Sequence, residues 1–345
     1  MSTLRDVARR ARVSVATAAR ALGGYGYVSP RTRERVLRAA QALDYHPNEI
    51  ARSMIRGRTQ TIAVIVSDNA NPFFASVVRG IEDAVRSSGY ALLLCNADED
   101  PEQEAMYLRM VRQRRVDGVI LSPSGGPPEL VRNLVRRGVP LVQVDRRIED
   151  LEADAVVVNS RAGVRAAIEH LVRLGHREIG LISGPRRLYT GRERLEGFLQ
   201  ALQDAGIRPD ARWILEGDFK APSGYVLVRR LLETRPRPTA LFVANNLMTI
   251  GALLGLKEAG VRIPEEMAVV GFDDMEWAPI LTPPLTAVAQ PGYDLGVAAG
   301  QLLLRRLQDP SGPPQVVVFQ PKLVVRESCG ARRTAQARGT SVYGS

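Results

Sequence analysis

Arginine is the residue whose chemistry stands out first in this 345-residue chain, which carries a net charge of +10. The first 58 residues contain twelve arginines and only four acidic residues, whereas residues 59–330 are close to neutral. A guanidinium group binds phosphate through two parallel hydrogen bonds. This concentration of charge favours a polyanion such as DNA as partner, and the alternative is a solvated basic face without one.

Residues that enzymes use do not form a recognisable catalytic motif. The three histidines are scattered, and the two cysteines, Cys95 and Cys329, cannot make a disulfide framework or a CxxC pair. The sequence has no GxxxxGK(S/T), GxSxG or HExxH pattern, and the Gly-rich run SPSGGPP at 122–128 has the composition of a loop. We therefore expect no enzyme and no bound cofactor or metal.

Three short helices are predicted to present the basic residues. Thr3, Ser14 and Ser29 each precede a helical pattern as an N-cap residue, and Pro30 follows Ser29 at the first helical position. The apolar positions of the three patterns are Leu4, Val7, Ala8 and Ala11, then Ala18, Ala21 and Leu22, then Val36, Leu37, Ala40 and Leu43. The first two helices with their short turn form a helix-turn-helix, whose second helix would enter the major groove of DNA.

From Thr61 onward, apolar strand patterns alternate with helical patterns. The expected strands are Ile62–Val66, Ala91–Cys95, Gly118–Leu121, Leu141–Val144, Val156–Val158, Ile179–Ile182, Trp213–Leu215, Leu241–Val243, Val269–Gly271, Val316–Phe319 and Leu323–Val325. Glycine just past a helix C-terminus is expected at Gly89, Gly138, Gly175, Gly206 and Gly260. Such a pattern predicts a helix-turn-helix headpiece followed by an α/β core of two doubly wound parallel-sheet subdomains.

Composition sets limits on the class of protein. A hydrophobic content of 45% and a charged content of 24% are ordinary for a soluble globular protein. No apolar run approaches the roughly 20 residues that a membrane helix needs, and the N-terminus has no apolar signal region. We expect a chain that is neither exported nor placed in a membrane.

Several segments of the sequence resemble the lactose-repressor (LacI/GalR) family of bacterial transcriptional regulators. The headpiece segments are DVARRARVSVATAARAL, YVSPRTRERV and LDYHPNEIARSM, and the core segments are NPFFASVVRGIEDA, ERLEGF, FVANN, GFDD and LTPPLTAV. The resemblance extends from Thr3 to about Glu327. It implies a type I periplasmic-binding-protein-like core, a homodimer, and a location in the bacterial cytoplasm.

The resemblance also implies domain boundaries. We expect a helix-turn-helix headpiece at 1–47, a hinge helix and linker at 48–60, an effector-binding and dimerisation core at 61–330, and a disordered tail at 331–345. Within the core, an N-subdomain of about 61–160 plus 291–320 and a C-subdomain of about 161–290 plus 321–330 are expected, with three crossings between them.

Ten residues are candidates for contact with double-stranded operator DNA. They are Ser14, Val15, Ala16, Thr17, Arg20, Ser29, Thr32, Asn48, Ala51 and Met54. Arg20 could read guanine through a bidentate pair, and the hydroxyl residues could hold phosphates, although helix capping alone would also explain the serines. Met54 occupies the place where the family has a leucine wedged into the minor groove, and the alternative is packing against the headpiece.

Six residues are candidates for binding a small effector of the sugar or nucleoside class. They are Phe73, Asp145, Arg194, Phe219, Asn245 and Asp273. Each lies near a predicted strand end or helix start, where a ligand could reach it. The alternative is that the aspartates cap the next segment and the phenylalanines belong to the core. Asn246, where the family has aspartate, and the loop residues Leu188 and Tyr189 leave the effector's identity open.

These observations favour an effector-responsive repressor that binds a pseudo-palindromic operator as a dimer. A solute-binding protein of the same core fold would carry an export signal and no basic headpiece, which is the reverse of this sequence. An α/β enzyme would need a catalytic group with a matched partner. A transcriptional activator remains an alternative within the same class.

Overall fold

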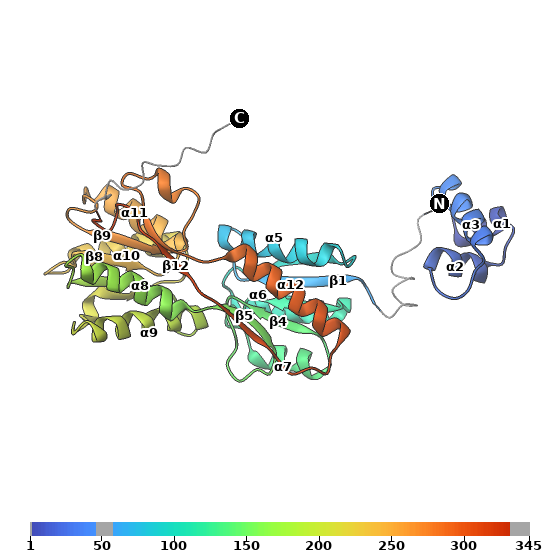
Figure 1. The fold of residues 1–345 in the computed structure, drawn as a ribbon, viewed down its shortest axis with the longest axis horizontal. Coiled ribbons are helices and arrows are strands. Elements are labelled where there is room, and N and C mark those ends of the chain that lie inside the picture. Colours follow the sequence, from blue (N-terminus) through green and yellow to red (C-terminus); the bar gives the residue numbers. More distant parts are fainter. Residues whose placement is uncertain (1, 46–57, 332–345) are drawn as a thin grey trace, which may run out of the picture. The chain divides into compact units, whose positions relative to one another are not determined.

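The computed structural model describes residues 2–45 and 58–331. The hinge candidates Asn48, Ala51 and Met54 lie outside the described residues, as does the predicted tail from residue 332 onward. The headpiece forms one compact unit and the α/β core forms another, and each is considered by itself (Figure 1).

The headpiece contains three helices, α1 (Leu4–Ala11), α2 (Val15–Gly23) and α3 (Pro30–Ala42). Each predicted N-cap is confirmed, because the side chains of Thr3, Ser14 and Ser29 accept hydrogen bonds from backbone N–H groups in the first turn of their helices. Gly24 closes α2 with a φ of 70°, the left-handed conformation that glycine adopts without strain.

Small apolar side chains make up the headpiece core. The buried residues are Val7, Ala8, Ala11, Ala18, Ala21, Val36, Ala39 and Ala40. Leu37 was predicted to face inward, and this prediction is wrong, since its side chain is 50% exposed. Ala39 is buried instead, because it lies three residues after Val36 on the same face of α3.

The first half of the core is built on a six-stranded sheet, and we call this half the N-subdomain. Its strand order is β11-β5-β4-β3-β1-β2, and the five strands from β11 to β1 run parallel to their neighbours. The strands are β1 (Thr61–Val66), β2 (Ala91–Asn96), β3 (Gly118–Leu121), β4 (Leu141–Val144), β5 (Asp154–Val158) and β11 (Val316–Phe319).

A second six-stranded sheet, in the order β12-β10-β9-β8-β6-β7, forms the C-subdomain. Its strands are β6 (Ile179–Ser183), β7 (Ile214–Glu216), β8 (Ala240–Val243), β9 (Ala268–Phe272), β10 (Thr286–Ala289) and β12 (Lys322–Val324). β10 was not predicted from the sequence, and it lies between Pro284 and Pro291. The predicted parallel arrangement has one exception, because β12 pairs antiparallel with β10 where the chain returns from the other subdomain.

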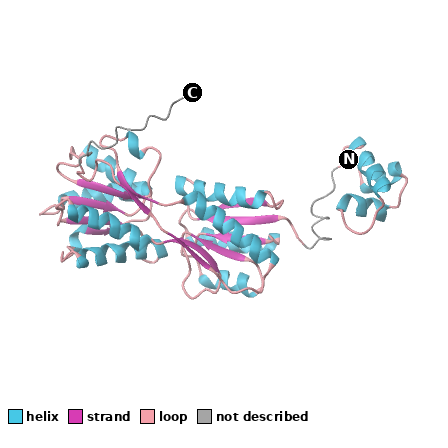
Figure 2. Cartoon of the chain, viewed as in Figure 1, coloured by secondary structure: helices cyan, strands magenta, loops and turns pink. Residues whose placement is uncertain are grey.

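Helices cover both faces of each sheet, as predicted (Figures 1 and 2). The N-subdomain carries α5 (Pro72–Arg86), α6 (Pro101–Arg114), α7 (Pro128–Arg136) and α12 (Gly292–Gln308). The C-subdomain carries α8 (Ser160–Arg173), α9 (Tyr189–Asp204), α10 (Ala221–Glu233) and α11 (Asn246–Glu258), with short 3-10 helices at Ala211–Trp213 and Ala278–Ile280. All five glycines predicted to follow a helix have positive φ.

Three segments connect the subdomains, after β5, after β10 and after β11. The carboxyl ends of β1, β4, β6 and β9 therefore meet where the two halves face each other, which is where open α/β sheets bind ligands. Among residues 2–45 and 58–331, no helix has the length and apolar character required to cross a membrane.

Candidate functional site

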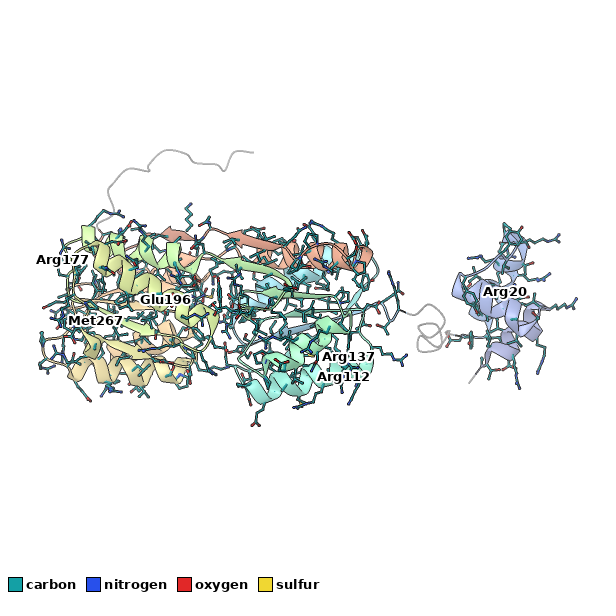
Figure 3. All side chains as sticks on the ribbon, turned by 90° about the horizontal axis from the view of Figure 1, so that it is seen from below. Arg20, Arg112, Arg137, Arg177, Glu196 and Met267 are labelled. Atoms are coloured by element: carbon teal, nitrogen blue, oxygen red, sulfur yellow. The ribbon has the colours of Figure 1, made fainter. Side chains whose placement is uncertain are left out.

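The outer face of α2 presents the residues predicted to read DNA bases. Val15, Ala16 and Arg20 are exposed, whereas Ala18 and Ala21 hold the opposite face in the headpiece core. Figure 3 labels Arg20 on the headpiece. Its Nε donates to the Ala16 carbonyl at 3.3 Å within the same helix, a long contact that leaves the guanidinium free to reorient.

Paired hydroxyl groups occupy the N-termini of α2 and α3. Ser14 Oγ lies 2.8 Å from Thr17 Oγ1, and Ser29 Oγ donates to Thr32 Oγ1 at 2.9 Å. Both serines also cap their helices, so the capping role is confirmed, while phosphate contact stays a prediction. A helix N-terminus with hydroxyl groups suits an anion because the helix dipole is positive there.

Few headpiece arginines have acidic partners. Within residues 2–45, only Arg9–Asp6 and Arg38–Glu34 form ion pairs, and both are exposed. The other arginines of residues 2–45 therefore contribute their full charge to the surface, which suits a polyanion.

A polar cleft lies between the two subdomains, and it contains all six residues predicted to bind an effector. Its lining consists of Asn71, Phe73, Phe74, Glu99, Asp145, Arg146, Thr190, Arg194, Phe219, Asn245, Asp273 and Gln290. The free space within it is only about 20 Å³. Ligand sites usually enclose about 300–1,000 Å³, so side chains or subdomains must move before a ligand can enter.

Two buried carboxylates line this cleft, one from each subdomain. Asp145 follows β4 and Asp273 follows β9, and both have φ near +70°, a strained conformation that is common at functional sites. Burial raises the pKa of Asp145 to about 6, although Arg146 and Arg194 oppose the shift. Burial likewise raises the pKa of Asp273, against the charge of Arg194 and a hydrogen bond from Gln290.

Arg194 of α9 is a buried cation whose charge opposes the raised pKa of both carboxylates. Its Nη1 donates to the Ala244 carbonyl at 2.6 Å, and its guanidinium carbon lies 3.8 Å from the centre of the Phe272 ring. Burial lowers the pKa of Arg194 despite the nearby Asp273 and Asp145. Its buried Nε has no hydrogen-bond partner, and neither has the buried Oε1 of Gln290. A donor and an acceptor are thus unmatched in the same cleft.

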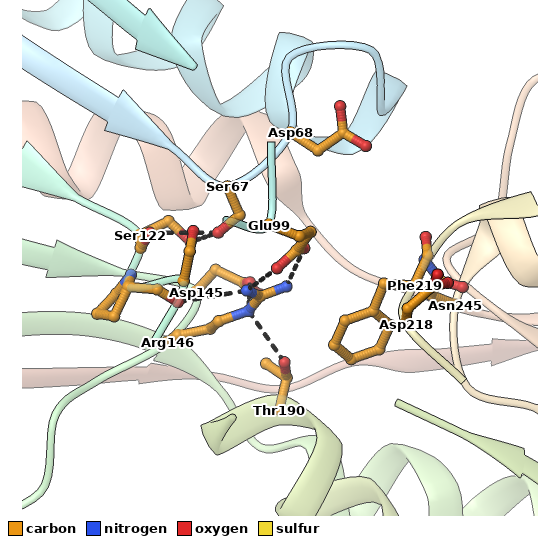
Figure 4. A network of polar contacts seen from close by, with 12 residues as sticks. Ser67, Asp68, Glu99, Ser122, Asp145, Arg146, Thr190, Asp218, Phe219 and Asn245 are labelled. Atoms are coloured by element: carbon orange, nitrogen blue, oxygen red, sulfur yellow. Dashed lines mark hydrogen bonds and ion pairs between the residues drawn. The ribbon is translucent and has the colours of Figure 1, made fainter. Parts of the chain in front are cut away.

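Arg146 lies in the same cleft and contacts Glu99 and Thr190 (Figure 4). Its Nη1 and Nη2 each donate to a carboxylate oxygen of Glu99 at 2.6 Å, and its Nε donates to Thr190 Oγ1 at 3.2 Å. Its guanidinium carbon lies 5.1 Å from the centre of the Phe219 ring. Burial alone would lower the pKa of Arg146, but the pair with Glu99 outweighs it and the pKa is raised.

Polar side chains also bridge the two subdomains. Lys220 Nζ, at the N-cap of α10, lies 2.7 Å from Asp68 Oδ2 and 2.6 Å from Asp98 Oδ1. Asn246 Nδ2, at the start of α11, donates to Asn71 Oδ1 at 2.8 Å. These contacts hold the cleft closed.

Asn245 has a structural role in addition to its place in the cleft. Its Oδ1 accepts from Met248 N and caps α11, while its Nδ2 donates to the Phe219 carbonyl, both at 2.9 Å. An amide offers two acceptor and two donor positions, so one of each remains for a ligand.

Several residues that line or bridge the cleft were not among the candidates from the sequence, including Glu99, Arg146, Thr190, Gln290 and Lys220. Each of these five residues follows a strand or begins a helix. That position was available as a signal, but many polar residues share it, and only the packing of the two subdomains selects these five. In the described part of the chain, no cluster of His, Cys, Asp and Glu is arranged to hold a metal.

Comparison with known proteins matches both parts of the chain. Residues 3–48 match the family described as "Bacterial regulatory proteins, lacI family", and residues 168–329 match the "Periplasmic binding protein-like domain". The HTH-type transcriptional repressors PurR of Photobacterium profundum and Edwardsiella ictaluri are 36% and 38% identical to the chain. These alignments cover 95% of this chain and 98% and 97% of the relatives.

Solved structures are similar over the same extent. A lac repressor dimer bound to operator and the anti-inducer ONPF is 29% identical, with a TM-score of 0.83, covering 96% of this chain and 99% of that one. A complex of the transcriptional regulator CelR with cellobiose is 34% identical, with a TM-score of 0.72, covering 95% of this chain and all of that one.

Proposed function

Since the chain belongs to the lacI family of bacterial regulatory proteins and is a DNA-binding transcriptional repressor, we propose that it binds a pseudo-palindromic operator as a homodimer and responds to a small sugar-like effector. It acts in the cytoplasm and catalyses no reaction. We propose the domain organisation that the sequence predicts, with a headpiece at 1–47, a hinge at 48–60 and an effector core at 61–330.

DNA recognition is assigned to α2 and the flanking hydroxyl groups. Arg20 would pair with guanine through its two terminal nitrogens, and Val15 and Ala16 would make apolar contacts in the major groove. Phosphate contacts are assigned to Ser14, Thr17, Ser29 and Thr32. Asn48, Ala51 and Met54 would contact the minor groove from the hinge, with Met54 as the wedge.

Effector binding is assigned to the cleft, and one observation carries this proposal. Arg194 Nε and Gln290 Oε1 are buried there without partners, beside the carboxylates of Asp145 and Asp273. Buried polar atoms are normally paired, so this unmatched donor and acceptor suit a polar ligand. Carboxylates, an amide and a guanidinium are the groups that bind sugar hydroxyls, and the faces of Phe73 and Phe219 can pack against a ring.

Effector binding would act on DNA through closure of the cleft. The nearly filled space means that the effector must displace Arg146 or shift the subdomains, and Lys220 and Asn246 would make or lose their bridges with that movement. An effector shifts such an equilibrium only by its difference in affinity for the two states, typically about 1–3 kcal/mol.

A patch of exposed apolar side chains on the C-subdomain supports the homodimer. Ile250 and Leu254 lie one turn apart on α11 and are 41% and 49% exposed, and Ile280 nearby is 81% exposed. Leu253 of α11 and Ile280 line one surface cavity, which places these elements side by side. Contiguous exposed apolar surface marks an interface, and a second copy of this chain would cover it.

Operator selection followed by effector titration tests this function. Random duplexes retained by the protein identify the operator, and fluorescence anisotropy then measures its affinity with and without sugars, nucleosides and bases. We expect a symmetric site and at least one ligand that changes operator affinity five-fold or more. A protein that binds the operator but ignores every small molecule would be a constitutive DNA-binding protein.

A further inference from the structure

A second cavity adjoins the effector cleft, with a volume of about 240 Å³. Residues 123–128 of the N-subdomain line one side of it, and residues 187–192 of the C-subdomain line another. Arg146 lines both spaces, so a ligand in the cleft can extend past this side chain into the cavity. The Gly-rich run predicted as a plain loop thus forms a wall of a cavity.

Positive charge dominates the lining of this cavity. Four arginines and one glutamate line it. The glutamate, Glu149, forms an ion pair with Arg192, with Oε1 and Nη2 2.6 Å apart. Arg146 forms an ion pair with Glu99. The remaining two, Arg147 and Arg187, have no carboxylate partner among residues 2–45 and 58–331, and Arg147 lies over the ring of Tyr189 at 5.6 Å. Two uncompensated guanidinium groups therefore line one cavity.

The backbone around the cavity is also suited to an anionic ligand. Helix α9 begins at Tyr189 on the cavity wall, and its N-cap Leu188 offers no side-chain acceptor to the first-turn N–H groups. Gly125 has a φ of 90°, and a Cβ there would lie 3.6 Å from Arg187 Nε. The buried Glu104 accepts from the N–H groups of Ser124 and Gly126 and so fixes this loop.

The two spaces have opposite charge balance. In the cleft, Glu99, Asp145 and Asp273 outnumber Arg146 and Arg194, whereas the cavity has two unpaired cations. A negative group would be repelled by the inner carboxylates and attracted to the outer arginines. The charge pattern therefore orients a ligand with its uncharged ring inward and an anion outward.

We propose that the cavity is an anion-binding subsite and that the effector is a sugar bearing a phosphate or carboxylate group. This inference rests on the proposed function, since it places the uncharged ring in the effector cleft. Arg147 and Arg187 bind the anion through charge-assisted hydrogen bonds, and the N-terminus of α9 adds its dipole. These two arginines therefore determine that the effector carries an anionic group.

Inorganic phosphate is the first probe. The full-length protein is titrated with sodium phosphate at constant ionic strength, and binding is followed by the melting temperature of the core. We expect the double variant Arg147→Gln/Arg187→Gln to bind phosphate at least tenfold more weakly than the unmodified protein. The control is Arg137→Gln/Arg186→Gln, which removes the same charge from exposed residues outside the cavity. Arg137 is the C-cap of α7 (Figure 3), and Arg186 is paired with Glu216. Equal phosphate binding by both double variants would overturn the subsite.

Matched sugars are the second probe. Neutral hexoses, their 6-phosphates and their uronic acids are compared for their effect on operator affinity. A phosphate or acid at least tenfold more effective than its neutral parent, with the preference lost in Arg147→Gln/Arg187→Gln alone, is the expected result. A neutral sugar that acts equally well overturns the anionic class and leaves the repressor function standing, whereas failure of every compound to alter operator affinity would count against the proposed function itself.

Discussion

Lys220 Nζ forms ion pairs with Asp68 Oδ2 at 2.7 Å and Asp98 Oδ1 at 2.6 Å, and these pairs connect the C-subdomain to the N-subdomain. Asp68 is 4% exposed at its side chain and Lys220 is 27% exposed. Burial lowers the pKa of Lys220, but its hydrogen bonds to the two aspartates outweigh burial and raise it. The cation is thus held in place on the closed cleft.

Replacing this lysine tests its part in closure. Lys220→Met should leave Asp68 without its cation and weaken the closed form by a few kcal/mol at most, because breaking a largely buried pair costs about 3–5 kcal/mol and partial exposure reduces that. We expect the fold to persist and the factor by which effector changes operator affinity to shift by tenfold or more. Lys322→Met, at an exposed site on β12, is the matched control. An unchanged coupling factor would mean that the bridge does not regulate closure.

Base recognition is tested at Arg20, on the exposed face of α2. Arg20→Ala should weaken specific operator binding by about 1–3 kcal/mol and relax the preference at one base pair in each half-site. Non-specific binding at low salt should change little, because it depends on the total charge. Arg38→Ala, on α3, removes the same charge as a control. A specificity profile identical to that of the unmodified protein would exclude Arg20 from base reading.

Effector response should depend on the buried arginine and aspartate of the cleft. Arg194→Ala or Asp273→Ala should retain operator binding and lose the response, since an unpaired buried polar group typically costs about 1–3 kcal/mol and a charged one more. Calorimetric titration of effector gives the loss of affinity, which we expect to be tenfold or more. Normal effector titration in both variants would move the binding site elsewhere.

Asp145 should make stability depend on pH. Its pKa is raised to about 6 by burial, above the value of about 3.9 for an unfolded aspartate, so the folded protein retains a proton that the unfolded chain releases. Its contribution to stability is therefore fully present below about pH 4 and is lost as pH rises through about 6, by up to about 3 kcal/mol at roughly 1.4 kcal/mol per pKa unit.

Urea unfolding between pH 4 and 7 measures this effect. Asp145→Asn keeps the shape and tolerates the positive φ but cannot titrate, so the unmodified protein should lose stability relative to the variant across this range. Asp150→Asn changes an exposed residue in the segment after β4. Its free energy of unfolding should change with pH in parallel with that of the unmodified protein. Parallel curves for Asp145→Asn as well would show that this carboxyl is already ionised at low pH in the folded state.

The homodimer is tested at the apolar patch of the C-subdomain. Ile280→Asp would bury a charge in the proposed interface and should give a monomer in sedimentation at concentrations where the unmodified protein is a dimer. Leu174→Asp, an exposed leucine at the C-cap of α8, should remain dimeric. A dimeric Ile280→Asp variant would place the interface on another surface.

The sequence by itself determined the local elements of this protein, because their signals are short-range. Thr3, Ser14 and Ser29 specified three helix starts through bonds to residues three positions later, and the glycines after the helices were identified from their place before apolar strands. The strand Thr286–Ala289 was not predicted, because it lies between Pro284 and Pro291 in a segment whose prolines and Thr282 are typical of a loop. The inward assignment of Leu37 failed because the buried face of α3 is formed by Val36, Ala39 and Ala40, which lie three and four residues apart.

Only the tertiary structure decided which polar residues meet. Asp145 and Asp273 were identified by their positions at strand ends, but nothing in the local sequence paired Arg146 with Glu99 across 47 residues, or Lys220 with Asp68 across 152. The same holds for the loop at 123–128, which became a cavity wall through its approach to Arg187. Such contacts form between residues distant in the chain once two subdomains pack, and the desolvation and opposite charges that they create exist only after that packing.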